Sequence, residues 1–343
     1  TPYEVYIINH LRGSAAASAG NVPLANKAFD IVLKSSFMPP DQRLPILTAM
    51  VRLAFSARDY ATAVRTIARY QEAGGTAAEG LEIEPQALYL DKRYEEALKQ
   101  VGRQIERRLA ERQAPTEQAL QILASSAAKL DDVEAYLGAL RLMATYYPTP
   151  NTWLDLIIRT EQRSGFSDRY TLDVYRLREQ TGTLLEPSDY MEAVQLALQA
   201  GYPGDAQRLI EGGYQRGVLG QADDSGAQRQ ERLRELVQRK VAEDRATAEE
   251  EASLAAQAER GDALVNTGYN LVGYGEYERG IALMNQGIEK GSLLQPNEAR
   301  LRLGHAYFMA GMKSEALEIF SSLKADDGSS ALAGLWRILA HND

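Results

Sequence analysis

The side chains best suited to bind a metal ion are three histidines far apart in the sequence, His10, His305 and His341. A zinc site needs three or four His, Cys or carboxylate ligands that converge on one ion. The chain has no cysteine, so it offers no thiolate ligand, cysteine nucleophile or disulfide. We therefore predict no metal site, and we expect His10 and His305 on helix surfaces and His341 at a frayed end.

Two short glycine motifs resemble nucleotide-binding loops. The run Gly273-Tyr274-Gly275 begins like a dinucleotide-binding turn, but it lacks the third glycine and the preceding strand. The run Gly311-Met312-Lys313-Ser314 resembles a phosphate-binding loop, but its glycine and lysine are not adjacent. The sequence also lacks a G-x-S-x-G or H-E-x-x-H motif. We predict that the chain binds no cofactor and is not an enzyme.

In two segments of the chain, clustered basic residues alternate with acidic residues. The first cluster consists of Arg103, Arg107, Arg108 and Arg112, with Glu106 and Glu111 beside them. The second runs from Arg229 to Lys240, with Glu231 and Glu235 between its arginines. Mixed charges at this spacing are typical of a solvated helix face with weak ion pairs. The alternative is a site for an acidic partner or a nucleic acid, but the net charge of −9 argues against a general nucleic-acid or membrane binder.

The elements that would position these residues are helices. Apolar residues recur with a period of 3.6, strand-like alternation is nowhere sustained, and Gly and Pro fall between the periodic segments. Of the 343 residues, 45% are hydrophobic and 25% charged, so the chain can bury a core. No apolar run approaches the roughly 18 to 20 residues that span a bilayer. The periodicity, with Gly and Pro between the periodic segments, therefore predicts an all-α fold.

A pattern near the end of the chain repeats at an interval of 36 residues. The matching positions are Gly268 with Gly304, Gly275 with Gly311, Gly280 with Ala316, and Met284 with Phe320. Earlier segments carry a similar small residue followed four positions later by a larger apolar one: Ala25 with Phe29, Ala63 with Ile67, Ala97 with Val101, and Ala206 with Ile210. A small side chain lets two helices approach closely. The pattern predicts stacked helical hairpins, which usually bind other proteins.

The repeat arithmetic predicts three regions. Residues 1–220 would form a first superhelix. Ala206 and Gly280 lie 74 residues apart, or two units of 37, so we expect a degenerate charged hairpin at 221–260. We place its turn near Asp244–Thr247, in preference to a single helix from Gln228 to Arg260. Residues 261–343 would form a last pair of hairpins and a capping helix that carries Trp336.

The residues Leu303-Gly304, Tyr307, Gly311, Ala316 and Phe320 resemble the tetratricopeptide repeat. Longer phrases are similar to a group of proteobacterial tetratricopeptide proteins without an assigned function: Thr1 to Tyr6, Tyr146 to Pro148, Phe166 to Arg169, Leu172 to Leu177, and Leu196 to Gly201. The resemblance implies a right-handed α-solenoid of about eight helical hairpins. It also implies an exported, periplasmic bacterial protein, with a cytoplasmic location as the alternative, and it implies no reaction.

In stacked hairpins the first helix of each pair lines the concave surface. The outward positions of these helices are our candidates for binding a partner: Arg52, Phe55, Gln86, Tyr89, Met191, Gln195, Tyr269, His305 and Phe308. We expect a non-catalytic scaffold that binds a peptide or protein in the groove. The alternatives are a structural component of a bacterial envelope or secretion assembly, and an enzyme whose site lies in the bowl of the solenoid. Carboxylates facing one another with raised pKa values would favour the enzyme.

Overall fold

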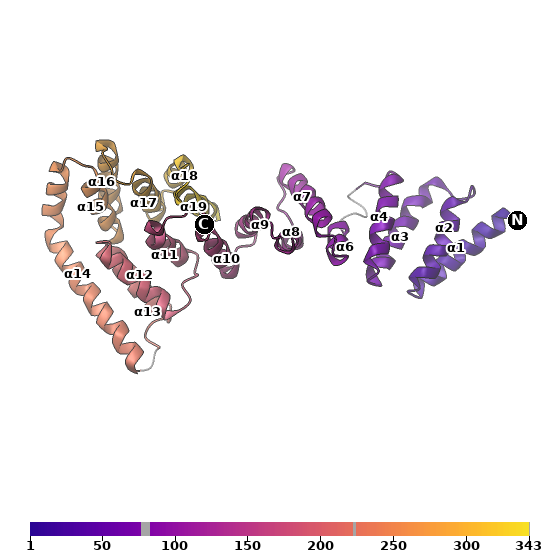
Figure 1. The fold of residues 1–343 in the computed structure, drawn as a ribbon, viewed down its shortest axis with the longest axis horizontal. Helices are drawn as coiled ribbons and strands as arrows, with labels where there is room; N and C mark the ends of the chain where they lie inside the picture. Colours follow the sequence, from indigo (N-terminus) through magenta and orange to yellow (C-terminus); the bar gives the residue numbers. More distant parts are fainter. Residues whose placement is uncertain (77–82, 222–223, 343) are drawn as a thin grey trace. The chain divides into compact units, whose positions relative to one another are not determined.

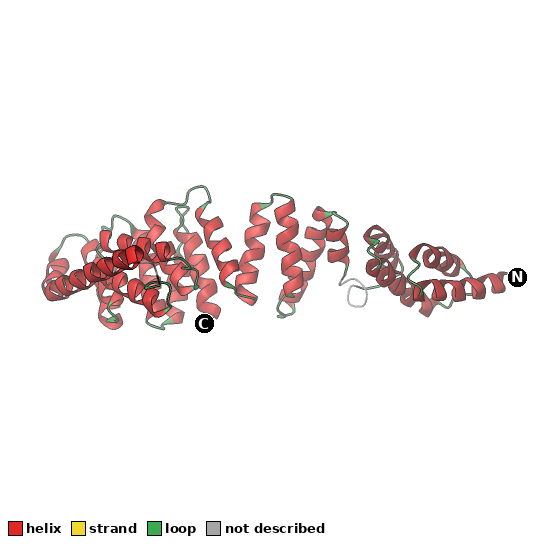
Figure 2. Ribbon diagram, turned by 90° about the horizontal axis from the view of Figure 1, so that it is seen from below, coloured by secondary structure: helices red, strands yellow, loops and turns green. Residues whose placement is uncertain are grey.

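The computed structural model describes residues 1–76, 83–221 and 224–342, and all regular secondary structure in these ranges is helical (Figures 1 and 2). The predicted all-α class is therefore confirmed. The chain divides into two compact units, Thr1–Leu142 (unit 1) and Met143–Asp343 (unit 2). The region boundaries that we expected near residues 220 and 260 both fall inside unit 2.

Consecutive helices pack against one another in both units. The helices of unit 1 are α1 (Pro2–Ser18), α2 (Val22–Lys34), η1 (Pro40–Gln42), α3 (Arg43–Ser56), α4 (Tyr60–Glu72), α6 (Glu84–Leu90), α7 (Tyr94–Ala110) and α8 (Glu117–Lys129). Helix α9 (Val133–Tyr146) runs across the division between the units. The helices of unit 2 are α10 (Pro150–Glu161), η2 (Asp168–Tyr170), α11 (Thr171–Gln180), α12 (Pro187–Gln199), α13 (Pro203–Gln215), α14 (Asp224–Gln257), α15 (Asp262–Gly273), α16 (Tyr277–Lys290), α17 (Pro296–Met309), α18 (Lys313–Ser322) and α19 (Ser329–Asn342).

The same tight turn joins the two helices of many pairs. One turn residue has a φ angle between 54° and 84°, and these residues are Gly20, Arg58, Lys92, Asp131, Gly201, Gly275 and Gly311. The N–H of the next residue donates to the carbonyl five positions earlier, as from Asn21 to Ala16 (2.9 Å). This bond satisfies a carbonyl at the helix end, and it is the usual way for a helix to stop at a left-handed residue. Glycine at this position relieves the strain of the left-handed conformation.

Close contacts between small and large residues hold the pairs together, as the sequence predicts. A Cβ atom on Gly304 would lie 2.5 Å from the ring of Phe320, and one on Gly13 would lie 2.7 Å from the ring of Phe29. A Cβ atom on Gly280 would lie 2.5 Å from the carbonyl oxygen of Gly268. The glycines therefore allow contacts that no larger residue permits.

The expected degenerate hairpin at 221–260 is wrong. Residues Asp224–Gln257 form one helix, α14, of 34 residues, which is about 50 Å long at 1.5 Å per residue. No glycine or proline stands between Gly226 and Gly261, and the segment is rich in Ala, Glu, Arg, Gln and Leu. These are strong helix formers, so nothing in the local sequence stops the helix.

The place where we expected the break is a point of attachment. The Asp244 carboxylate accepts hydrogen bonds from Asn270 Nδ2 on α15 (2.6 Å) and from the hydroxyl of Tyr274, the residue that follows α15 (2.7 Å). Burial raises the pKa of Asp244, although these two hydrogen bonds oppose the rise. The middle of α14 is thus fixed to α15 by a polar contact, and it has no need to turn.

The predicted terminal helix is confirmed as α19. Its Trp336 is buried, and its ring centroid lies 4.9 Å from that of His305 and 5.2 Å from that of Phe308. Helix α19 also packs against α10, which lies much earlier in the chain. In addition, the Tyr170 hydroxyl donates to Asp327 Oδ2 (2.9 Å), so the two ends of unit 2 are joined.

Candidate functional site

Helix α11 lies in the interior of unit 2 and is buried on nearly all sides. Its buried residues are Leu172, Asp173, Val174, Tyr175, Arg176, Leu177 and Glu179. It contacts α10 and α12, and its side chains reach α13, α15 and α17. Because α11 buries charged as well as apolar side chains, the surrounding helices must supply partners of opposite charge.

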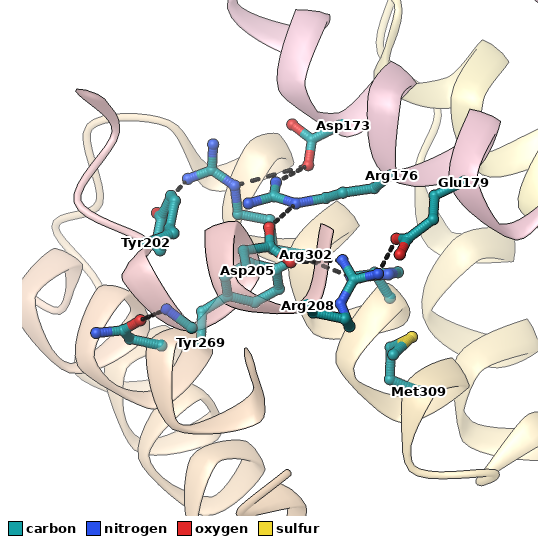
Figure 3. Close-up of polar contacts among 12 residues, drawn as sticks. Asp173, Arg176, Glu179, Tyr202, Asp205, Arg208, Tyr269, Arg302 and Met309 are labelled. Atoms are coloured by element: carbon teal, nitrogen blue, oxygen red, sulfur yellow. Dashed lines mark hydrogen bonds and ion pairs between the residues drawn. The ribbon is translucent and has the colours of Figure 1, made fainter. Parts of the chain in front are cut away.

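Arg176 is the centre of this buried ion network (Figure 3). Its side chain is 1% exposed, its Nε donates to Asp205 Oδ2 (2.5 Å), and its Nη1 donates to Asp173 Oδ1 (2.5 Å). Burial alone would lower the pKa of Arg176, but the charge of Asp205 and further interactions raise it well above its usual value. The guanidinium therefore stays charged, and it depends on these two carboxylates for its stability.

Two further arginines complete the network around α11. Arg208 on α13 forms an ion pair with Glu179 and also donates to Asp205 Oδ1 (2.6 Å). Arg302 Nε on α17 lies 3.8 Å from Asp173 Oδ1. Thus three residues spaced three apart on α11, Asp173, Arg176 and Glu179, each face an opposite charge on a neighbouring helix (Figure 3).

Two tyrosine rings enclose the central guanidinium. The guanidinium carbon of Arg176 lies 4.6 Å from the ring centroid of Tyr269 and 5.3 Å from that of Tyr202. Such cation–π contacts strengthen in a desolvated site. The Tyr202 hydroxyl accepts from Arg302 Nη1 (2.8 Å) and donates to Asn266 Oδ1 (2.9 Å). The rings thus replace water around the cation and connect α12–α13 to α15 and α17.

The expected exposure of Tyr269 and His305 on a concave surface is wrong. They are 2% and 3% exposed, and the Tyr269 hydroxyl lies 2.6 Å from His305 Nδ1. Burial, aided by nearby arginines, lowers the pKa of His305 well below 6.5, so the ring is neutral at pH 7. Arg176 of α11 covers Tyr269 and Trp336 of α19 covers His305, and neither helix was expected on this surface.

The other candidate residues remain at least partly accessible. In unit 2, Gln195 is exposed, whereas Met191 and Phe308 are half-buried. In unit 1, Arg52 is exposed. Phe55, Gln86 and Tyr89 are half-buried. Phe55 packs against Tyr60, and Tyr89 packs against Tyr94. Among all nine candidates, the structure brings Tyr269, His305 and Phe308 together, through Trp336.

Unit 1 has an open groove of about 660 Å³ along α3. It is lined by Ala17, Leu44, Pro45, Thr48, Ala49, Arg52, Leu53 and Ser56. We call this the unit 1 groove. Its walls are mostly small or apolar, and Arg52 is its only charged lining residue. One of our candidate residues therefore lies in the wall of this groove.

Unit 2 has a smaller cleft of about 290 Å³, between the α12–α13 turn, α15 and α17. It is lined by Ala200, Tyr202, Asp262, Val265, Asn266, Leu294, Gln295, Glu298, Ala299 and Arg302. Burial raises the pKa of Glu298, and an ion pair with Arg302 opposes the rise. The other carboxylate, Asp262, accepts from Arg260 (2.8 Å) and from the N–H of Leu294 (3.0 Å). Both acids are therefore already engaged by protein donors.

Our sequence interpretation missed the ion network. The signal that could have revealed it is the spacing Asp173-x-x-Arg176-x-x-Glu179, because these charges interrupt a segment rich in Leu, Val and Tyr. A short helix that carries both apolar and charged residues all round its surface has no solvent face. Asp205 and Arg208, three residues apart on α13, give the matching half of the pattern.

Within residues 1–76, 83–221 and 224–342, no cluster of three or more His, Asp or Glu is arranged to hold a metal ion. In the same ranges no helix is both long enough and apolar enough to cross a membrane. No protein-family model matches this chain, and no curated protein has a significant match to it.

Proposed function

We propose that this chain is a non-catalytic scaffold that binds a peptide or protein segment in the unit 1 groove. The observation that carries this proposal is the groove itself. It is open and largely apolar, and its lining includes one charged group, the guanidinium of Arg52. An apolar trough with one fixed charge suits an extended or helical segment with apolar anchors and one acidic residue.

The proposed architecture is a tetratricopeptide-like α-solenoid. The recurring turn and the glycine contacts between paired helices support it, because they recur at corresponding positions of several pairs. Stacks of such hairpins expose the first helix of each pair for binding. Helix α3, which forms most of the groove wall, is the first helix of its pair.

Unit 1 is a better candidate for the binding surface than unit 2. In unit 2, α11 already contacts the first helices α12, α15 and α17. The carboxylates gathered there face arginines, which suits a structural role better than acid–base chemistry. We therefore assign partner binding to Arg52 in the groove wall, and we extend the proposed surface to Phe55, Gln86 and Tyr89, which are half-buried outside the groove lining.

The proposal is tested by selecting peptides from a displayed random library against the full chain. We expect the selected peptides to carry an acidic residue, and to lose at least tenfold in affinity for Arg52→Glu and for Ala49→Arg. Arg65→Glu, on the second helix α4, is the matched control and leaves binding unchanged. If the selected peptides bind the groove variants and the control equally well, the groove is not the binding surface.

A further inference from the structure

Helix α14 carries opposite charges on its two halves. Residues 228–240 contain five basic and two acidic side chains, whereas residues 241–257 contain five acidic side chains and one basic one. The helix lies along the outer edge of unit 2 and packs on α13 and α15 (Figure 1), with Leu233, Val237 and Val241 buried on its inner side. The basic half contains the cluster from Arg229 to Lys240, to which the proposed function gives no role.

Exposed residues on the outer side of α14 form one stripe along the helix. We call it the α14 stripe, and it consists of Glu235, Arg239, Ala242, Ala246, Glu249 and Ser253, all of them exposed. Successive members are separated by 4, 3, 4, 3 and 4 positions. This is the spacing at which two helices pack along a common seam. The alanines at the centre of the stripe allow a second helix to approach closely.

We propose that a second copy of this chain packs on the α14 stripe, with the two α14 helices antiparallel about a two-fold axis. The stripe is symmetric about the midpoint between Ala242 and Ala246. Reversing the helix direction therefore places Ala242 opposite Ala246 of the second copy. It also places Arg239 opposite Glu249 of the second copy, and each of these contacts occurs twice. The same stripe thus pairs with itself and forms a closed dimer, not a filament.

Charge complementarity favours a second copy as the occupant of the stripe. In the antiparallel arrangement the basic half of each helix lies along the acidic half of the other, and beside the stripe Glu243 lies opposite Arg245 of the second copy. The Glu249 side chain is 82% exposed although it pairs with Arg279, so its carboxylate can accept from a second arginine. A parallel pair would instead set Arg239 against itself. A purely acidic helix would match only the basic half.

The association should be weak. Exposed ion pairs contribute roughly 0–1 kcal/mol each, and a contact between two single helices falls at or below the roughly 1,200 Å² of a standard interface. The net charge of −9 on each copy also opposes association. At about 0.15 M salt this repulsion is screened beyond roughly 8 Å. We therefore expect dimers at roughly micromolar or higher concentrations under these conditions.

The first test mixes two variants with reversed charges and measures dissociation constants by sedimentation. Arg239→Glu and Glu249→Arg should each weaken dimerisation by itself about fivefold, because each creates two like-charge contacts across the axis. An equal mixture of the two variants should associate about as tightly as wild type. In the mixed dimer residue 239 of each copy again meets an opposite charge at residue 249, and this occurs only in the antiparallel register.

Arg107→Glu is the matched control for the charge reversal. Arg107 is exposed on α7 of unit 1, and its replacement changes the net charge by the same amount as Arg239→Glu. It should leave the dissociation constant within about twofold of wild type. A wild-type chain that stays monomeric up to about 500 µM would overturn the proposal, and so would a mixture that associates no more tightly than its separate components.

The second test uses Ala242→Cys and Ala246→Cys in separate copies of a chain that has no other cysteine. Packed helices lie about 8–10 Å apart and their Cα atoms about 2.3 Å from each axis, so facing Cα atoms would be about 3.4–5.4 Å apart. Two copies of the same residue would also be displaced by four residues, or about 6 Å, along the axis, which separates them by about 7–8 Å. A disulfide requires roughly 4.4–6.8 Å.

After mild oxidation of an equal mixture, the disulfide between residue 242 of one chain and residue 246 of the other should dominate. We expect it to exceed either like-with-like product at least about tenfold. One chain carries a tag, so the three products separate by size. A ratio near two, as random collision gives, or an excess of like-with-like products, as a parallel pair gives, would contradict the antiparallel dimer.

Discussion

Replacing Arg176 with methionine tests whether the buried ion network holds α11 in place. Methionine has a similar length and suits an apolar setting, so the change removes the charge and the hydrogen bonds with little change in volume. It leaves Asp173 and Asp205 without their shared donor, and it removes the cation–π contacts to Tyr202 and Tyr269.

The expected loss follows from the partners that remain. Breaking a buried ion pair by removing one member costs about 3–5 kcal/mol, because the other charge is left uncompensated. Here Asp205 keeps Arg208 (2.6 Å), and Asp173 keeps Arg302 at 3.8 Å. We therefore expect the free energy of unfolding to fall by about 3 kcal/mol, near the lower end of this range. With an m-value of about 3 kcal/mol/M, this lowers the urea midpoint by about 1 M.

Tryptophan fluorescence provides a reading of unit 2 by itself. The chain has two tryptophans, Trp153 on α10 and Trp336 on α19, and both are buried in unit 2. Unfolding of this unit exposes both rings. The free energy of unfolding measured in urea by this signal therefore reports the stability of the helices around α11.

Arg279→Met is the matched control. Arg279 pairs with Glu249 at 2.7 Å, but the two side chains are 40% and 82% exposed. Exposed pairs contribute roughly 0–1 kcal/mol and are screened by salt, whereas buried pairs are screened much less. If Arg176→Met lowers the stability of unit 2 no more than Arg279→Met does, at low and high salt alike, the network does not hold α11, and our reasoning fails.

Two further predictions use the same fluorescence assay. Gly280→Ala should destabilise unit 2 by about 1–3 kcal/mol, because its Cβ would lie 2.5 Å from the backbone oxygen of Gly268. Gly334→Ala, whose Cβ would have no neighbour within 4 Å, should be neutral or stabilising, and equal effects would contradict the packing argument. Asp327→Asn should lower the stability at pH 7 by about 1–2 kcal/mol. Burial alone would raise the pKa of Asp327, but hydrogen bonds, including that from Tyr170, lower it overall. The ionised form therefore stabilises the fold above its unfolded pKa of about 3.9, and the difference between wild type and Asp327→Asn should shrink below about pH 4; a constant difference would exclude this cause.

The sequence predicted the features that depend on local spacing. Helical periodicity indicated the all-α class, and the 36-residue interval marked Gly268, Gly280, Gly304 and Phe320, which lie in close contacts between paired helices in the structure. The sequence marks these positions because glycines at helix crossings and glycines at left-handed turns recur at a fixed spacing. The terminal helix with Trp336 was also predicted from local spacing, because its apolar residues recur at helical intervals.

The features that depend on distant segments could not be read in this way. Repeat arithmetic led us to break α14 near Asp244, although the absence of glycine and proline from 227 to 260 argued for one helix. The burial of Tyr269 and His305 depends on α11 and α19, which come from outside their own helix pairs. No spacing within one pair of helices reveals what a later or earlier helix will cover.

The ion network explains why α11 can occupy the interior of unit 2 in one position. An apolar groove would accept an apolar helix in several registers, because hydrophobic contact is not directional. Here a slip by three residues would bring Asp173 or Glu179 to the place of Arg176, opposite the carboxylate of Asp205, and like charges would meet in a desolvated site. Buried charges are best attested as devices that fix register, and they add little net stability. The interior of unit 2 is thus committed to a helix of its own chain, so the open unit 1 groove is the surface that we expect to take a partner.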